Sequence, residues 1–213
     1  MSNSSVTLKE KAYEIIRERI ISGELKPGDV LTERTLVEML GMSRTPIRAA
    51  LERLDANGLA KYTPNKGLIV NEMSLQKVID LYDFRIAMES FVVRKLSAQH
   101  WNEEDVNWFE ENLRQQERSM QEQDYEAFTQ ADWQFHRNLA AVLGNAEILQ
   151  AMDQLQDKLY LTALKVLRKD RSRIQISYED HVRLFQEIRS GNAQSAVSGM
   201  ESHLEYGKQI LVL

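Results

Sequence analysis

The sequence predicts a mainly α-helical protein of two domains: a small domain in residues 1–73 that ends in a β-hairpin, and an all-α helical bundle in residues 74–213. Three observations predict this division. All three prolines and five of the nine glycines lie within the first 67 residues, so the turns are concentrated there. The first domain carries a net charge of +1, and the remainder carries −6. The remainder also consists of long stretches with helical periodicity and short interruptions.

The first domain begins with two predicted helices. Residues 8–20 show apolar side chains at helical spacing, and Gly23 ends the run. After a turn at residues 27–29, Thr32 is the expected N-cap of a second helix that ends at Leu40. Three side chains of this helix are expected to face inward: Leu36, Met39 and Leu40.

A third helix and a hairpin complete this domain. Ser43 is the expected N-cap of the helix, and Pro46 falls in its first turn, where a missing N–H costs little. Its inward side is expected to carry Ile47, Ala50, Leu51 and Leu54. Residues 59–62 and 68–70 are expected to form two strands joined by a hairpin turn. Helix, helix, tight turn, helix and hairpin is the order of a winged helix-turn-helix.

The outward side of the third helix carries groups suited to DNA. Arg44, Thr45 and Arg48 lie there near the helix N-terminus. An arginine can donate to O6 and N7 of guanine, while hydroxyl groups and backbone N–H groups contact phosphate. Arg34 of the preceding helix is placed to touch DNA backbone or base, and the hairpin tip at residues 65–67 can reach a minor groove or a phosphate. Surface arginines alone would equally suit a solvated helix, but the ordered set of elements favours DNA.

The second domain splits into six predicted helices with short links, which is typical of an antiparallel bundle. They cover residues 75–99, 103–123, 125–143, 146–169, 173–190 and 193–211. We expect a cytoplasmic protein, because no apolar run is long enough to span a membrane and no secretory signal precedes the first helix. The absence of cysteine excludes disulfides and thiol nucleophiles and is consistent with a reducing compartment.

Three histidines and one aspartate of the predicted bundle point to a metal site. His136, His181 and His203 each lie on the apolar face of a different helix, where an unpaired polar group is costly. Asp132 lies one turn before His136 on the same face. One carboxylate and three imidazoles suit Zn²⁺, Ni²⁺ or another divalent first-row ion. Each histidine taken singly would more simply be a hydrogen-bonded core residue.

Arg85 and Glu89 form a further polar pair on an apolar helix face. Two interpretations stay open for this pair. It can help to hold an anionic effector, or it can be an internal salt bridge.

Residues 25–34 and 40–54 resemble the GntR family of bacterial transcription regulators. They read LKPGDVLTER and LGMSRTPIRAALERL. The resemblance implies DNA contacts at Arg34, Ser43, Arg44, Thr45, Arg48, Lys66 and Gly67. Ala49 stands where many members carry Glu, which changes the helix surface but leaves the arginines in place.

The segments DWQFH at residues 132–136, EDH at 179–181 and MESHL at 200–204 are similar to the metal-binding pattern of FCD effector domains in the FadR subfamily. Six helices resemble the shorter, VanR-like form. The resemblance implies a cavity beside the metal that takes a small organic acid, and a repressor that releases DNA when the acid binds.

The expected function is therefore that of a homodimeric regulator of a palindromic operator, because a two-fold protein reads a palindrome in successive major grooves. A metal-responsive sensor is one alternative. A helical-bundle metalloenzyme is another, but no general base or nucleophile motif accompanies the expected ligands, so we expect no enzymatic activity.

Overall fold

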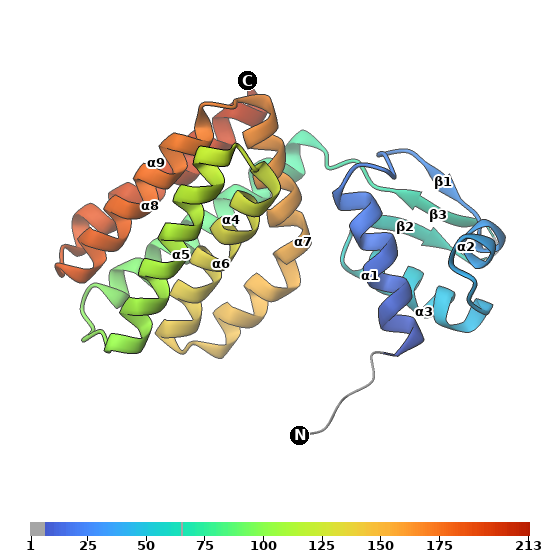
Figure 1. The fold of residues 1–213 in the computed structure, drawn as a ribbon, viewed down its shortest axis with the longest axis horizontal. Helices are drawn as coiled ribbons and strands as arrows, with labels where there is room; N and C mark the ends of the chain where they lie inside the picture. Colours follow the sequence, from blue (N-terminus) through green and yellow to red (C-terminus); the bar gives the residue numbers. More distant parts are fainter. Residues whose placement is uncertain (1–6, 65) are drawn as a thin grey trace. The chain divides into compact units, whose positions relative to one another are not determined.

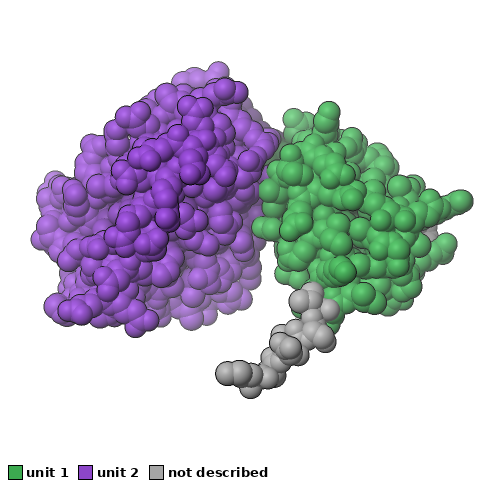
Figure 2. All heavy atoms as spheres, viewed as in Figure 1, with its two compact units in different colours: residues 1–73 green, residues 74–213 purple. Residues whose placement is uncertain are grey.

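The computed structural model describes residues 7–64 and 66–213, and the mainly helical fold class is confirmed (Figure 1). Contacts divide the chain into two compact units, residues 1–73 (unit 1) and 74–213 (unit 2), which Figure 2 colours separately. None of the helices in the described ranges is long and apolar enough to cross a membrane.

Unit 1 combines three helices with a small antiparallel sheet. Its elements are α1 (Leu8–Ile21), β1 (Val30–Leu31), α2 (Glu33–Leu40), α3 (Arg44–Ala56), β2 (Ala60–Thr63) and β3 (Gly67–Val70). The sheet order is β1-β3-β2, so β3 is the central strand. In the register, Ile69 lies opposite Lys61 on β2 and opposite Val30 on β1.

Strand β1 is missing from the sequence prediction, which had only a turn before Thr32. Two residues are too short to show a periodicity, and the strand exists because its edge pairs with β3. Gly28 N–H donates to the Val70 carbonyl at 2.9 Å, and Val70 N–H donates back to the Asp29 carbonyl at 3.0 Å. Unit 1 is therefore closed by contacts between segments distant in sequence.

Helix α3 packs as predicted, with its four inward side chains buried: Ile47, Ala50, Leu51 and Leu54. The prediction for α2 was partly wrong. Leu36 is fully buried, but Met39 is 36% exposed and its sulfur lies 3.0 Å from the Arg19 guanidinium. Ser43 is the N-cap of α3 by position, yet its side chain makes no capping hydrogen bond and is exposed.

In the described residues, unit 2 contains six helices. They are α4 (Leu75–Leu96), α5 (Glu103–Glu122), α6 (Tyr125–Leu143), α7 (Ala146–Lys169), α8 (Arg173–Arg189) and α9 (Ala193–Val212). Five of them begin at a residue whose side chain accepts a hydrogen bond from the first turn: Ser74, Asn102, Asp124, Asn145 and Asn192. These caps explain why the breaks in the sequence carry short polar residues.

Substitutions at Gly67 and Gly28 can test how closely β1 must pack on β3. Its φ is +105°, and a Cβ built there would lie 2.3 Å from the Leu31 carbonyl oxygen. Gly28 has a similar φ of +89° with nothing within 4 Å of such a Cβ. We expect Gly28→Ala to lower the free energy of unfolding of unit 1 by about 1 kcal/mol through backbone strain alone.

Gly67→Ala should lower the free energy of unfolding of unit 1 by about 3 kcal/mol. Here the backbone strain is combined with the overlap between the new Cβ and the Leu31 backbone. Native-state hydrogen exchange of unit 1 amides in the full chain measures both values. Equal losses for the two variants would show that β1 can move away without penalty.

Candidate metal centre and DNA-binding surface

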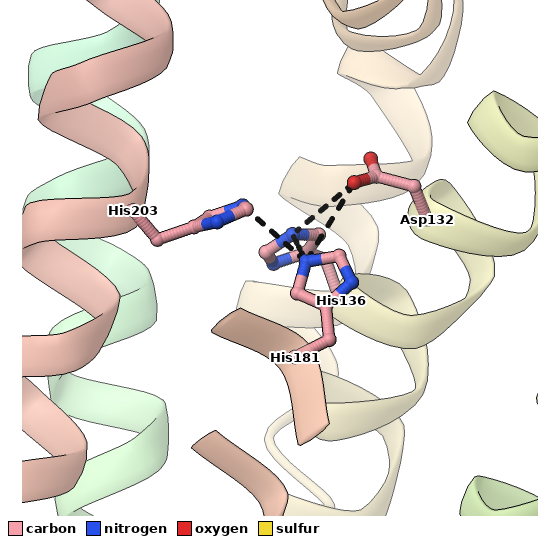
Figure 3. Close-up of side chains that lie close together, drawn as sticks. All are labelled: Asp132, His136, His181 and His203. Carbon is pink, nitrogen blue, oxygen red and sulfur yellow. Dashed lines mark hydrogen bonds and ion pairs between the residues drawn. The ribbon is translucent and has the colours of Figure 1, made fainter. Parts of the chain in front are cut away.

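Four side chains from three helices converge in the interior of unit 2 (Figure 3). Helix α6 supplies Asp132 and His136, α8 supplies His181 and α9 supplies His203. One oxygen or nitrogen atom from each residue lies within 4.8 Å of the other three. The three histidines are buried and Asp132 is half-buried. We call these four residues the His/Asp cluster.

The His/Asp cluster has the spacing of ligands around a small cation. His181 Nε2 lies 3.2 Å from His136 Nε2 and 3.3 Å from His203 Nε2. It lies 3.6 Å from Asp132 Oδ1. Two ligands of a tetrahedral zinc ion with ordinary bond lengths are about 3.3 Å apart. His136 Nε2 lies 4.0 Å from Asp132 Oδ1, and all four ligand atoms lie within 4.8 Å of one another, so a small inward shift of side chains would bring them around one divalent ion.

Two of the imidazoles are oriented by acceptors behind them. His136 Nδ1 lies 2.5 Å from Glu89 Oε2, and His181 Nδ1 lies 2.7 Å from Gln116 Oε1. When these oxygens accept the Nδ1–H protons, the Nε2 lone pairs face the centre of the cluster. Such outer hydrogen bonds are the usual way in which proteins fix the tautomer of a metal-binding histidine.

The third imidazole has a more complex partner. His203 Nδ1 lies 3.1 Å from Asp180 Oδ2 and 2.9 Å from Arg173 Nη2. The same Arg173 nitrogen donates to the His203 carbonyl at 3.0 Å and lies 3.3 Å from Asp180 Oδ2. Donation from His203 Nδ1 to Asp180 is the arrangement that leaves the Nε2 lone pair directed at the cluster.

Burial keeps two of the histidines neutral near pH 7. Burial lowers the pKa of His181 well below its ordinary value, and the neighbouring His203 lowers it further. Burial also lowers the pKa of His203 to about 4, although its hydrogen bond to Asp180 acts in the opposite direction. Neutral imidazoles with their lone pairs turned toward one another repel unless a cation or a proton donor lies between them. The donor set therefore fits a divalent metal ion.

Arg85 and Glu89 form an internal salt bridge, which was one of the two interpretations open from the sequence. Arg85 Nε donates to Glu89 Oε1 at 2.7 Å, and both side chains are buried. Burial opposes ionisation of Glu89, but Arg85 and His136 outweigh this effect and hold its pKa at about 2. Glu89 is thus an anionic partner of His136. Arg85 also lines a cavity, so a part for it in effector binding stays a prediction.

This cavity of about 30 Å³ lies beside the His/Asp cluster. Its lining includes Asp132 and His203 from the cluster and two buried guanidinium groups, Arg85 and Arg173. Tyr82 also lines the cavity, and burial raises the pKa of its phenol to about 12, so the hydroxyl keeps its proton at neutral pH. The lining therefore supplies positive charge and hydroxyl donors next to the cluster.

The predicted DNA-reading residues of α3 form an exposed surface in unit 1. Ser43, Arg44, Thr45 and Arg48 are all exposed. Arg34 on α2 is exposed as well, and its Nε donates to Glu38 at 2.9 Å.

The hairpin was predicted to contact DNA through Lys66 and Gly67, and the structure differs from this prediction at one of the two residues. Lys66 is exposed, but Gly67 is buried, and the close approach that requires a glycine there is to Leu31. Asn65, at the predicted hairpin tip, lies outside the described residues. Contacts of Lys66 and Gly67 with DNA stay predictions.

One carboxylate joins three elements of this surface. Glu33, at the start of α2, accepts from Arg48 Nε at 2.9 Å and from the Tyr62 hydroxyl at 2.7 Å. Its side chain is 11% exposed, against 46% for Arg48. A carboxylate on a surface expected to meet phosphate is unfavourable unless it is neutralised, and here both Glu33 oxygens accept hydrogen bonds. Glu33 thus engages Arg48 through Nε, and the Arg48 side chain stays 46% exposed.

Comparison with known proteins follows the same division of the chain. A model of the FCD domain matches residues 80–206, more than half of the chain, and a model described as "Bacterial regulatory proteins, gntR family" matches residues 8–70. The chain belongs to the GntR family. It is a DNA-binding transcriptional regulator and not an enzyme.

Two relatives of this GntR regulator span nearly its full length. The HTH-type transcriptional regulator LutR of Bacillus subtilis is 29% identical over 90% of this chain and 95% of LutR. The HTH-type transcriptional repressor RspR of Escherichia coli is 25% identical over 95% of this chain and 88% of RspR. Among solved structures, E. coli McbR/YncC shares the fold, with a TM-score of 0.79 at 19% identity over 97% of this chain and 98% of that one.

Several residues of both sites were missed in the sequence. Gln116, Asp180 and Arg173 surround the histidines, and Glu33 holds Arg48. A signal for Gln116 existed, because it lies seven residues after Phe109 on the inward side of α5. The other three side chains are charged residues of ordinary appearance whose partners lie on other elements.

Glu33 provides a test of the DNA surface in this GntR regulator. We expect Glu33→Ala to weaken binding to a selected palindromic site about tenfold, because Arg48, which we expect to contact a base, loses the ion pair that restricts its side chain. Affinity for random DNA should stay equal or rise, since a negative charge is removed. Fluorescence anisotropy at fixed salt measures both affinities.

Tyr62→Phe is the matched control, because it removes one hydrogen bond to Glu33 and leaves the Arg48 pair in place. We expect it to change the affinity for the selected site less than Glu33→Ala does. Equal strengthening of both complexes by Glu33→Ala would show that Glu33 acts only as a repulsive charge.

Proposed function

We propose that this GntR regulator is a homodimeric repressor whose affinity for a palindromic operator is changed by a small organic acid bound beside a metal ion. The observation that carries the proposal is the position of the cavity, which has the His/Asp cluster on one side and two buried arginines in its lining. A relative that is a repressor, RspR, supports the sign of regulation. The homodimer and the palindromic operator are proposed together, because a two-fold symmetric protein reads a palindrome in successive major grooves.

Asp132, His136, His181 and His203 would hold the ion, with Zn²⁺ or Ni²⁺ the best matches to one oxygen and three nitrogen donors. When bound, the ion supplies a Lewis-acidic position for a carboxylate oxygen of the effector. The protein side chains do the remaining work: they orient the imidazoles, exclude bulk water and provide hydrogen-bond donors.

The charges around the cavity favour an anionic ligand. Three carboxylates face the centre or its partners: Asp132, Glu89 and Asp180. Two guanidinium groups, those of Arg85 and Arg173, neutralise two of them. A bound dication then leaves an excess of one positive charge in a buried site, where an unbalanced charge is costly. One carboxylate of a small acid would remove the excess.

The small size of the cavity indicates how binding of an acid would change the conformation of unit 2. A volume of about 30 Å³ is of the order needed for one water molecule, so an organic acid must enlarge it. The lining residues belong to α4, α6, α7, α8 and α9. The acid therefore binds a conformation in which these helices are further apart, and it shifts the population toward this conformation by its differential affinity.

The small cavity also favours a second candidate function, in which the metal ion itself is the signal. In this alternative, loading of the His/Asp cluster alone changes operator affinity. The two candidates separate in one experiment, a metal titration of the chelator-treated protein in an operator-binding assay without any acid.

The metal site predicts a stoichiometry. Protein purified without chelator should contain about one divalent ion per chain by elemental analysis. His181→Ala with His203→Ala should reduce the content to about one tenth, because two of four ligands are lost. His100→Ala is the control, since His100 is exposed and far along the chain from the cluster. Full metal content in the double variant would contradict the site.

The effector class predicts a difference between charged and neutral analogues. Metal-loaded protein should be stabilised against heat by a small carboxylate such as acetate or lactate, since a ligand that binds the folded state stabilises it by mass action. The corresponding amide should have little effect, because it lacks the negative charge. The same acid should weaken operator binding. Equal stabilisation by acid and amide would contradict an anion site.

A further inference from the structure

Helix α5 contributes none of the four residues of the His/Asp cluster, yet it carries two deeply buried amides. Gln116 is fully buried and Asn112 is 4% exposed. They lie one helical turn apart on the inward side of α5. A buried amide is costly unless its donors and acceptors are used, so the partners of these two side chains indicate what they do.

The two amides form a chain of hydrogen bonds that ends at the cluster. Asn112 Nδ2 donates to the Ala131 carbonyl at 3.0 Å. Gln116 Nε2 donates to Asn112 Oδ1 at 2.7 Å. Gln116 Oε1 then lies 2.7 Å from His181 Nδ1. The chain starts on α6, one residue before Asp132, and ends on α8.

The chain has only one direction. A main-chain carbonyl can accept but cannot donate, so the amide nitrogen of Asn112 must face Ala131. This orientation presents Asn112 Oδ1 to Gln116. Because this oxygen can only accept, Gln116 must donate to it from Nε2. Gln116 therefore presents an oxygen to His181, and His181 must carry its proton on Nδ1. Its Nε2 is left as a lone pair facing His136 and His203.

The partner of His203 does not impose such a direction by itself. His203 Nδ1 has both a carboxylate acceptor, Asp180, and a guanidinium donor, Arg173, within 3.1 Å. The partner of His136 is the charged Glu89 carboxylate, which can only accept and so requires the proton on His136 Nδ1. Only His181 is oriented by a neutral group, and this group adds no further carboxylate to the buried centre.

We infer that Asn112 and Gln116 are positioning residues that fix the Nδ1–H tautomer of His181 and so present its Nε2 to a metal ion. The inference deepens the proposed metal site and rests on it for its purpose. The tautomer itself is a property of the metal-free chain and is tested without metal.

Two substitutions of Asn112 form a matched pair. Asn112→Leu and Asn112→Asp both remove the donor to Ala131, but Asn112→Asp keeps an acceptor for Gln116. Long-range ¹H–¹⁵N NMR of the metal-free full chain reports the tautomer of His181. We expect Nδ1–H in the wild type and in Asn112→Asp, and a mixture of tautomers in Asn112→Leu.

Gln116→Met removes the acceptor with little change in volume and should also give a mixture. Gln115→Met, the same substitution at the adjacent position of α5, should leave the Nδ1–H tautomer unchanged. Circular dichroism checks that each variant is folded. An unchanged Nδ1–H tautomer in folded Gln116→Met would overturn the inference.

Metal affinity gives the second measurement. Competition with a chromophoric chelator for Zn²⁺ should show binding about 10- to 100-fold weaker in Gln116→Met and Asn112→Leu than in the wild type. Wild-type affinity in both would overturn the positioning role. If the wild type itself binds no Zn²⁺ while the tautomer changes as expected, the proposed metal site fails and the hydrogen-bond chain stands.

Discussion

The convergence of three imidazole Nε2 atoms at one buried point is the constraint on which unit 2 depends. Such a group of acceptors is stable in a low-dielectric interior only if every Nδ1 has a partner and a cation can lie between the rings. Helices α4, α5 and α8 supply the partners through Glu89, Gln116 and Asp180. Helices α4, α5 and α8 are thus tied to the His/Asp cluster by polar contacts as well as by packing.

In unit 1, too, a polar side chain is held in place by hydrogen bonds from neighbouring elements. A single carboxylate, that of Glu33, accepts hydrogen bonds from Arg48 on α3 and from the Tyr62 hydroxyl on β2 at the same time. The glycine at position 67 lets β1 close on β3, which places Thr32 and Glu33 immediately after a strand of the sheet. The position of Glu33, and with it the partner of Arg48, therefore depends on the close backbone approach of Gly67 to Leu31.

Helix α4 is the first helix of unit 2 and directly follows unit 1 in the chain. Its N-cap, Ser74, directly follows the last residue of unit 1, and its middle carries Arg85 and Glu89. The same helix therefore lines the cavity and holds the partner of His136. In the proposed function, a ligand that enlarged the cavity would act on a helix that directly follows unit 1 in the chain.

The order of the helices, the hairpin and the buried faces of the three histidines were predictable from the sequence, because each depends on a local period or on a short motif. The DNA contacts expected of the α3 and hairpin residues stay predictions. The bundle faces of His136, His181 and His203 follow from spacing within single helices. Their outer partners do not, because periodicity says which side of a helix is buried but not which neighbour it meets. Gln116, Asp180, Arg173, Glu33 and strand β1 acquire their roles only when segments distant in the chain pack together, and tertiary structure alone decides those contacts.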